Sequence, residues 1–151
     1  MLVSKLELFH FRMRQNEHKK LLTEHGLKVT HQRLAVLEAL MELSNHPTAE
    51  MIIGYVKIKY PKIAVATVYN ILDILCKDGI VRKIKTDQDF VRYDAEPKSH
   101  HHLYCSTCEV IENYYDEELD AILRNYFKHK SIPDWEIKEI TLQIAGQYNK
   151  C

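Results

Sequence analysis

Residues 65–94, VATVYNILDILCKDGIVRKIKTDQDFVRYD, predict one helix followed by two short strands. Apolar side chains recur at helical spacing through the first half of this stretch, and Gly79 is a typical helix stop. Residues 80–86 and 90–94 have the composition of strands, and the polar residues 87–89 predict a turn between them. We therefore expect a helix that leads directly into a basic hairpin.

Further helices are predicted upstream. Thr30 can cap a helix whose apolar residues recur at helical spacing, and Thr48 can cap another that Pro61 bounds. A more polar, helix-like stretch at residues 16–25 precedes them. Three helices followed by a basic hairpin predict a winged helix-turn-helix domain, which we place at residues 1–94.

The remaining residues predict a second, smaller module. Residues 95–99 have the composition of a hinge, and an apolar stripe that starts at Leu119 predicts an amphipathic helix. A module of about fifty residues buries little apolar surface, so we expect it to pair with a second copy. The predicted fold class is α+β, with a small α/β dimerisation domain at residues 100–151. Its strands are expected at residues 101–105, 109–114 and 135–145.

Charge and hydropathy exclude several classes of protein. With 46% hydrophobic and 28% charged residues, the chain is globular rather than disordered. No apolar run approaches the roughly 18 residues of a membrane span, and charges interrupt the N-terminal stretch, so we expect a cytoplasmic protein. Residues 1–94 carry 15 basic and 11 acidic side chains, whereas residues 95–151 carry 6 and 10. This asymmetry favours two modules with different partners.

The strongest chemical pattern is a run of three histidines followed by a CxxC pair. On a strand, His100 and His102 point to one face while His101 points to the other. Cys105 and Cys108 have the spacing at which paired thiolates bind zinc. In a reducing cytoplasm this pair indicates metal or redox chemistry rather than a disulfide framework.

Several stretches together resemble the ferric uptake regulator family of metal-dependent repressors. They are HPTAE at 46–50, ATVYN at 66–70, GIV at 79–81, RYD at 92–94 and HHHLYCSTC at 100–108. The resemblance covers roughly residues 26–146. It implies an N-terminal winged-helix domain, a C-terminal dimerisation domain and a regulatory metal between them.

The resemblance also implies a regulatory site with five ligands, which are His46, Asp94, His100, His102 and an acidic residue after the cysteines. Imidazole and carboxylate donors suit Fe(II) and Mn(II). Family members usually have Gly after the second cysteine, where this chain has Glu109. A deletion there makes Glu112 the fifth ligand, whereas an ungapped alignment gives Asn113. We predict Glu112, because a carboxylate is the better ligand for a hard dication.

Within the family, Asn70 and Asp94 resemble the peroxide-sensing branch. The additional regulatory site of iron and zinc regulators is missing, since other side chains replace its ligands at Ser99, His101 and Ile140. The peroxide branch implies that Fe(II) reacts with hydrogen peroxide, that His46 or His100 becomes 2-oxo-histidine, and that DNA is released. Mn(II) would hold the same shape without that chemistry. Regulation by iron, manganese or zinc stays an alternative within the family.

The family's structural zinc site is incomplete in this chain. Cys105 and Cys108 are present, but Cys151 is the only C-terminal cysteine, and Tyr148 stands in place of the penultimate ligand. Structural zinc prefers four ligands. Three outcomes stay open: a three-cysteine site completed by water or another side chain, a weak site, or no structural Zn(II).

In a helix-turn-helix, the helix at residues 65–78 would enter the major groove of double-stranded operator DNA. Near its start, Tyr69 can pack on a thymine methyl group and Asn70 can pair with adenine, with Thr67 beside them. Ala64, where the family often has Ser, leaves this helix without a side-chain cap. Candidate phosphate contacts are Arg33, Lys57, Lys59, Lys62, Arg82, Lys83, Lys85 and Arg92.

A metallohydrolase is the alternative outside this family. Such an enzyme needs an open metal position and commonly a general base, for which Glu50 and Glu96 are candidates. No HExxH motif supports either residue, and the winged-helix pattern would stay unexplained. We therefore expect a homodimeric repressor that is not an enzyme and that uses no organic cofactor.

Overall fold

The computed structural model describes residues 5–86 and 89–151. The chain divides into two compact units, Met1–Glu96 and Pro97–Cys151. No helix in the described part of the chain combines the length and the apolarity that crossing a bilayer requires.

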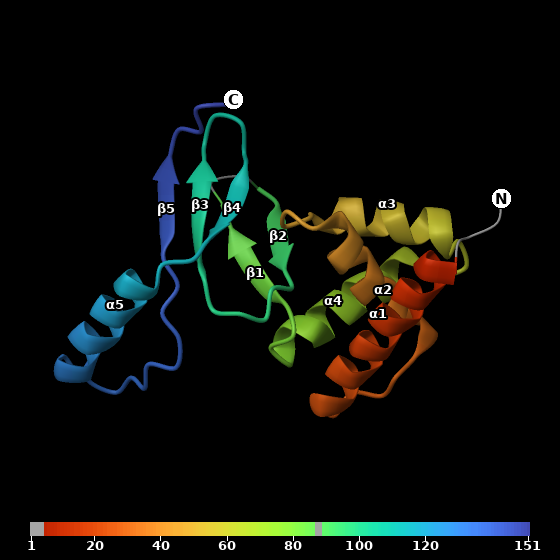
Figure 1. Ribbon diagram of the computed structural model, residues 1–151, viewed down its shortest axis with the longest axis horizontal. Coiled ribbons are helices and arrows are strands. Elements are labelled where there is room, and N and C mark those ends of the chain that lie inside the picture. Colours follow the sequence, from red (N-terminus) through yellow and green to blue (C-terminus); the bar gives the residue numbers. More distant parts are fainter. Residues whose placement is uncertain (1–4, 87–88) are drawn as a thin grey trace. The chain divides into compact units, whose positions relative to one another are not determined.

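Helices dominate the N-terminal unit, and an antiparallel hairpin follows them (Figure 1). Helix α1 begins much earlier than the predicted stretch at residues 16–25. Its first half contains good helix formers and neither Gly nor Pro. Of the predicted hairpin turn, residues 87 and 88 lie outside the described residues. The elements are α1 (Lys5–Glu24), α2 (His31–Leu43), α3 (Ala49–Lys59), α4 (Val65–Lys77), β1 (Arg82–Lys85) and β2 (Val91–Asp94).

Helix boundaries follow the predicted caps. The Thr30 hydroxyl accepts the Arg33 N–H at 3.3 Å, and the Thr48 hydroxyl accepts the Met51 N–H at 3.3 Å. Gly79 follows α4 with φ +74°, a left-handed conformation that glycine adopts without a steric penalty. These local signals determine where α2, α3 and α4 start or stop.

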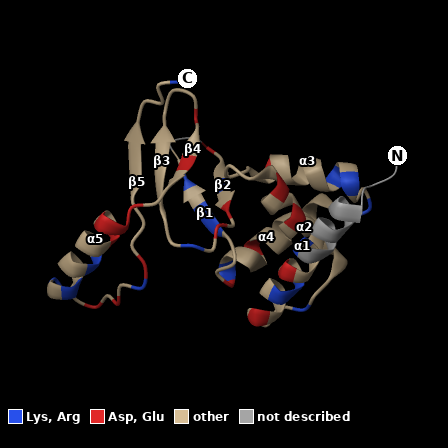
Figure 2. Ribbon diagram, in the orientation of Figure 1, with Lys and Arg blue, Asp and Glu red and all other residues tan. Residues whose placement is uncertain are grey.

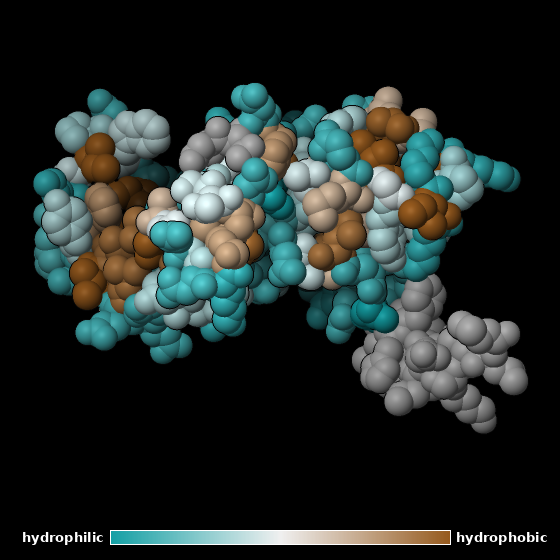
Figure 3. Space-filling view, turned by 90° about the horizontal axis from the view of Figure 1, so that it is seen from above, coloured by the Kyte–Doolittle hydropathy of each residue, from teal (hydrophilic) through white to brown (hydrophobic). Residues whose placement is uncertain are grey.

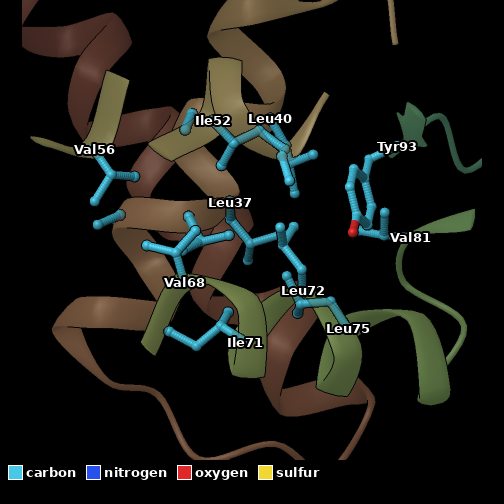
Figure 4. Close-up of a cluster of buried hydrophobic side chains, with 14 of the residues drawn as sticks. Leu37, Leu40, Ile52, Val56, Val68, Ile71, Leu72, Leu75, Val81 and Tyr93 are labelled. Atoms are coloured by element: carbon cyan, nitrogen blue, oxygen red, sulfur yellow. The ribbon is translucent and has the colours of Figure 1, made fainter. Parts of the chain in front are cut away.

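A single cluster of apolar side chains holds α2, α3 and α4 together (Figure 4). Each large side chain in it contributes roughly 1.5–3 kcal/mol by leaving water. Cys76 packs at the edge of this cluster, and burial raises the pKa of its thiol. The fully buried members include Leu37 of α2, Ile52 and Val56 of α3, and Leu72 and Leu75 of α4.

The C-terminal unit is a three-stranded sheet with one helix (Figure 1). Its strands lie in the order β4-β3-β5, where β3 (His101–Cys105) pairs antiparallel with β4 (Ile111–Tyr114) and parallel with β5 (Gln143–Gly146). Helix α5 (Glu117–His129) is acidic in its first turn and basic in its last, which complements the helix dipole (Figure 2). The predicted α+β class is confirmed.

The predicted strand at residues 135–145 is wrong in extent, because only Gln143–Gly146 is a strand. In the parallel register, Gln143 lies opposite His102, so the residues before Leu142 run past the start of β3 and have no strand there to pair with. Trp135, at the predicted start, is 76% exposed. A strand-like composition cannot reveal the length of the neighbouring strand.

The C-terminal unit buries few apolar side chains. Among its described residues only Tyr104, Cys105 and Ile111 are buried hydrophobics, and α5 has no buried residue. Apolar side chains gather instead on the surface of this unit (Figure 3). The exposed ones are Tyr115, Ile122, Tyr126, Ile132, Trp135, Ile137 and Ile144.

Candidate functional site

The N-terminal unit brings His46 and Asp94 together. Two hydrogen bonds align β2 with the turn between α2 and α3: the Tyr93 N–H donates to the Pro47 carbonyl at 3.0 Å, and the Arg92 side chain donates to the His46 carbonyl at 3.2 Å. Candidate ligand atoms of His46 and Asp94 consequently lie within 4.8 Å of each other, and both side chains are buried. This is a two-ligand half-site of one imidazole and one carboxylate.

The C-terminal unit brings His100 and His102 together. Their Nε2 atoms are 3.0 Å apart, and Nδ1 of His100 lies 2.7 Å from the Lys98 carbonyl oxygen. A backbone carbonyl at Nδ1 favours the tautomer with the proton on Nδ1, in which Nε2 of His100 carries the lone pair that a metal ion would accept. The two imidazoles form a second half-site, as the alternation along the strand predicts.

His101 points to the other face of the sheet, also as predicted. Its Nδ1 accepts the Leu142 N–H at 3.1 Å, and its Nε2 lies 3.2 Å from a carboxylate oxygen of Asp120. Because Nδ1 is an acceptor, a neutral ring carries its proton on Nε2, the nitrogen beside Asp120. His101 thus connects β3 to α5 and to the segment before β5, a role that its position in the sequence does not reveal.

The structure does not bring Glu112 to the histidine pair. In the β3–β4 register, Glu112 lies opposite Leu103 and Asn113 lies opposite His102. Directly opposite residues share a face, and neighbours along a strand alternate, so Glu112 is on the face away from His102. The β3–β4 register therefore does not support Glu112 as the fifth ligand and favours Asn113. Ligand chemistry alone favours a carboxylate, but it does not reveal the strand register.

The three predicted cysteines converge in the C-terminal unit. The Sγ atoms of Cys105, Cys108 and Cys151 lie within 4.8 Å of one another, and Cys108 is joined to Cys151 by a disulfide where the sequence predicts metal-binding or redox thiols. Tyr148 contributes its N–H to Cys105 Sγ at 3.2 Å, and this hydrogen bond lowers the pKa of the Cys105 thiol. Low pKa and convergence are properties that zinc-binding thiolates share.

Both clusters fit metal ions by their donor chemistry. Nitrogen and oxygen donors in the two half-sites suit Fe(II), Mn(II) or Zn(II), whereas the three cysteines suit Zn(II) once the Cys108–Cys151 disulfide is reduced to thiolates. The histidine and carboxylate donors are divided equally between the two units of the chain.

Helix α4 presents the predicted DNA-reading residues at its start. Tyr69 and Asn70 are exposed and Thr67 is half-buried, while Val68 between them faces the core. The Tyr69 hydroxyl donates to Glu50 of α3 at 3.4 Å. No side-chain cap precedes α4 at Ala64, in agreement with the sequence.

Several predicted phosphate contacts have partners within the chain. Lys59 forms an ion pair with the buried Glu38, and Lys83 with Asp73 at 2.8 Å. Arg82 is half-buried, with its guanidinium 3.7 Å from Asp94. For Arg82 and Lys59 this revises the prediction, since both cations are directed at buried carboxylates that sequence spacing could not match to them. Arg33 donates to the Lys28 carbonyl, and Lys62 is exposed.

Comparison with known proteins gives a consistent set of relatives. The model of the ferric uptake regulator family matches residues 24–145. The chain is 31% identical to the peroxide operon regulator of Bacillus subtilis over 130 residues, which cover 86% of this chain and 88% of the relative. It is 29% identical to the peroxide-responsive repressor PerR of Staphylococcus epidermidis, over 86% of this chain and 85% of that protein.

Solved structures share the fold. The ferric uptake regulator of Pseudomonas aeruginosa with manganese matches with a TM-score of 0.74 and 21% identity, over 88% of this chain and 98% of that one. The peroxide stress regulator of Campylobacter jejuni matches with a TM-score of 0.68 and 24% identity, over 99% and 100%. At these identities the likeness shows the fold alone.

Proposed function

Because the chain belongs to the ferric uptake regulator family of metal-dependent transcriptional regulators, we propose that it is a repressor that responds to hydrogen peroxide. The observation that carries this proposal is the pair of half-sites, one in each unit of the chain. Two relatives at about 30% identity are peroxide regulators, which supports hydrogen peroxide as the signal.

One metal ion would use both half-sites. The unit boundary Glu96–Pro97 falls between Asp94 and His100, and the linker between these two ligands spans at most roughly 20 Å when extended. The four ligands would be His46, Asp94, His100 and His102, with Asn113 on the correct face for a fifth contact. A metal bound to all four would fix the DNA-binding unit relative to its neighbour.

The chain's own part in peroxide sensing would be to expose a ligand imidazole to oxidation. Bound Fe(II) would supply the electron that reduces hydrogen peroxide, chemistry that Mn(II) lacks under the same conditions. We assign the oxidised side chain to His46 or His100, one from each half-site. Oxidation at imidazole carbon 2 impairs a nitrogen donor, so the metal ion would no longer be held by both units and DNA would be released.

We assign a different function to each of the two units. We assign DNA binding to residues 1–94, with residues 95–99 as the hinge and residues 100–151 as the dimerisation domain. Thr67, Tyr69 and Asn70 would face base edges, while exposed cations such as Lys62 would face phosphates. The few buried apolar side chains of the C-terminal unit support a homodimer, which would act in the cytoplasm.

The three cysteines would hold Zn(II) in a reducing environment. A thiolate cage contributes to folding stability when zinc binds, and an incomplete cage contributes less. Cys105, Cys108 and Cys151 would supply three thiolates, and the fourth position would be filled by water or another group.

The joint use of both half-sites can be tested with ligand variants. His46→Ala removes a ligand from one unit, His102→Ala removes one from the other, and His25→Ala, an exposed histidine of the N-terminal unit outside both half-sites, is the matched control. We expect both ligand variants to lose Mn(II)-dependent DNA binding and to bind Mn(II) at least tenfold more weakly by calorimetry. Unchanged Mn(II) affinity in either variant would overturn the shared site.

A further inference from the structure

We propose that Glu38 is a positioning residue for DNA binding, because its buried carboxylate, through Tyr60, fixes the turn that leads into α4. This inference rests on the proposed DNA-binding role of α4. It concerns residues of the N-terminal unit that are not among the proposed metal ligands or DNA contacts.

Glu38 is a buried carboxylate with several donors. It lies on α2 among apolar neighbours, is only 5% exposed, and is directed at the C-terminal end of α3. One oxygen accepts from the Tyr55 hydroxyl at 3.2 Å and from the Lys59 ammonium, and the other accepts from the Tyr60 hydroxyl at 2.5 Å. All three donors belong to the last turns of α3 or to the residue that caps it.

The carboxylate is charged in the folded protein. Burial alone would raise the pKa of Glu38, but the hydrogen bonds from Lys59 and Tyr60 outweigh it and hold the pKa below its usual value. Burial and the Glu38 carboxylate together raise the pKa of Tyr60 to about 12, so its hydroxyl stays a donor at neutral pH. A buried ion pair is a weak source of stability compared with apolar packing, so its geometric role is the informative one.

Tyr60 is the residue through which Glu38 reaches the turn. Its N–H donates to the Val56 carbonyl at 2.7 Å, and its carbonyl accepts the Ile63 N–H at 3.0 Å. The His31 ring packs edge-on against the Tyr60 ring, with centroids 5.0 Å apart. Tyr60 therefore joins the end of α3, the turn and α2, and Glu38 sets the position of its ring.

This turn matters because α4 begins directly after it. Ile63 is buried, and Ala64 offers no side-chain cap to the first turn of α4. The start of α4 depends on the packing and hydrogen bonds of the preceding turn, and Tyr69 and Asn70 follow within two turns. Hydrogen bonds to base edges weaken steeply with small errors in position, so a displaced turn lowers specificity before it lowers general DNA affinity.

Two tyrosines on the same carboxylate supply the matched comparison. Tyr60→Phe and Tyr55→Phe each remove one hydroxyl donor to Glu38, but only Tyr60 belongs to the turn. The probe is the DNA sequence that Mn(II)-loaded wild-type protein selects from a random pool, compared with unrelated DNA of equal length. We expect Tyr60→Phe to reduce the ratio of selected to unrelated binding about tenfold, and Tyr55→Phe less than twofold. The dependence of affinity on salt should be unchanged in both, because no phosphate contact is removed.

Hydrogen exchange reports on the turn independently of DNA. In conditions where the two variants have the same free energy of unfolding, the Ile63 amide hydrogen should exchange faster in Tyr60→Phe than in Tyr55→Phe. If Tyr60→Phe does not fold, Glu38→Gln, which preserves the shape of the side chain, should show the same loss of specificity. Equal specificity ratios for the two tyrosine variants, or a wild-type ratio for Glu38→Gln, would overturn the inference. Failure of wild-type protein to select any sequence would instead overturn the proposed function.

Discussion

The histidines at 100–102 show that the sequence position of a residue predicts the strand face it occupies but not its partner. His100 and His102 share a face and His101 does not, which follows from strand geometry alone. The partner of His101 does not follow, because Asp120 lies on a separate helix whose docking depends on tertiary contacts. For the same reason, the sequence does not reveal which of Glu112 and Asn113 lies on the face of His102, since the strand register decides this.

Cys151 allows a direct test of the cysteine cluster. In reducing buffer we expect wild-type protein to retain about one zinc ion per chain against brief exposure to a chelator. Cys151→Ser should lose that zinc, because two thiolates and a hydroxyl bind zinc poorly. Cys76→Ser is the control, since Cys76 lies on α4 and outside the cluster. Metal analysis by mass spectrometry measures both; full zinc retention in Cys151→Ser would contradict the three-sulfur site.

Helix α4 has a clear apolar periodicity but no side-chain cap at its start. Its apolar residues recur at helical spacing, so its existence and its buried face are predictable, and α4 ends at Lys77, close to the predicted stop. Ala64 gives no start signal, and the polar contacts of Glu38 with Tyr60 involve residues far apart in the sequence. Capping and periodicity therefore predict most of the N-terminal fold but miss the buried polar contacts between helices.

A serine at the missing cap should stabilise the N-terminal unit. Ala64 has the extended backbone conformation of a cap residue, so Ala64→Ser can accept a hydrogen bond from the first turn of α4. We expect a gain of about 0.5–1 kcal/mol in the free energy of unfolding, measured with urea. Ala66→Ser, inside the same helix turn, should give no gain because serine is the poorer helix former. No gain in stability in Ala64→Ser would show that other contacts already satisfy this helix end.

Within the whole molecule, the two units differ in how many apolar side chains they bury. The N-terminal unit has a continuous apolar core, whereas α5 buries no residue and exposes apolar side chains along its length. The predicted apolar stripe on α5 is present, but no residue of α5 is buried within the chain. The extent of the last strand was not predictable either, because it depends on where β3, its neighbour in the sheet, begins.

Dimerisation should depend on this apolar surface. Ile122 of α5 is 59% exposed, and Ile122→Glu places a charge on it. We expect the variant to sediment as a monomer at concentrations where wild-type protein is a dimer. Ile58→Glu is the control, because Ile58 is 87% exposed on α3 in the other unit, and it should leave the dimer intact. A dimeric Ile122→Glu variant would move the interface away from α5.

We propose that one metal ion couples the two units and that peroxide breaks this coupling. The most direct measurement is operator binding by Mn(II)-loaded and Fe(II)-loaded protein before and after micromolar hydrogen peroxide, combined with mass spectrometry of the peptides that contain His46 and His100. We expect only the Fe(II) form to lose DNA and to gain one oxygen atom on one of these histidines. If both forms stay bound to DNA and unoxidised, the chain responds to metal but does not sense peroxide.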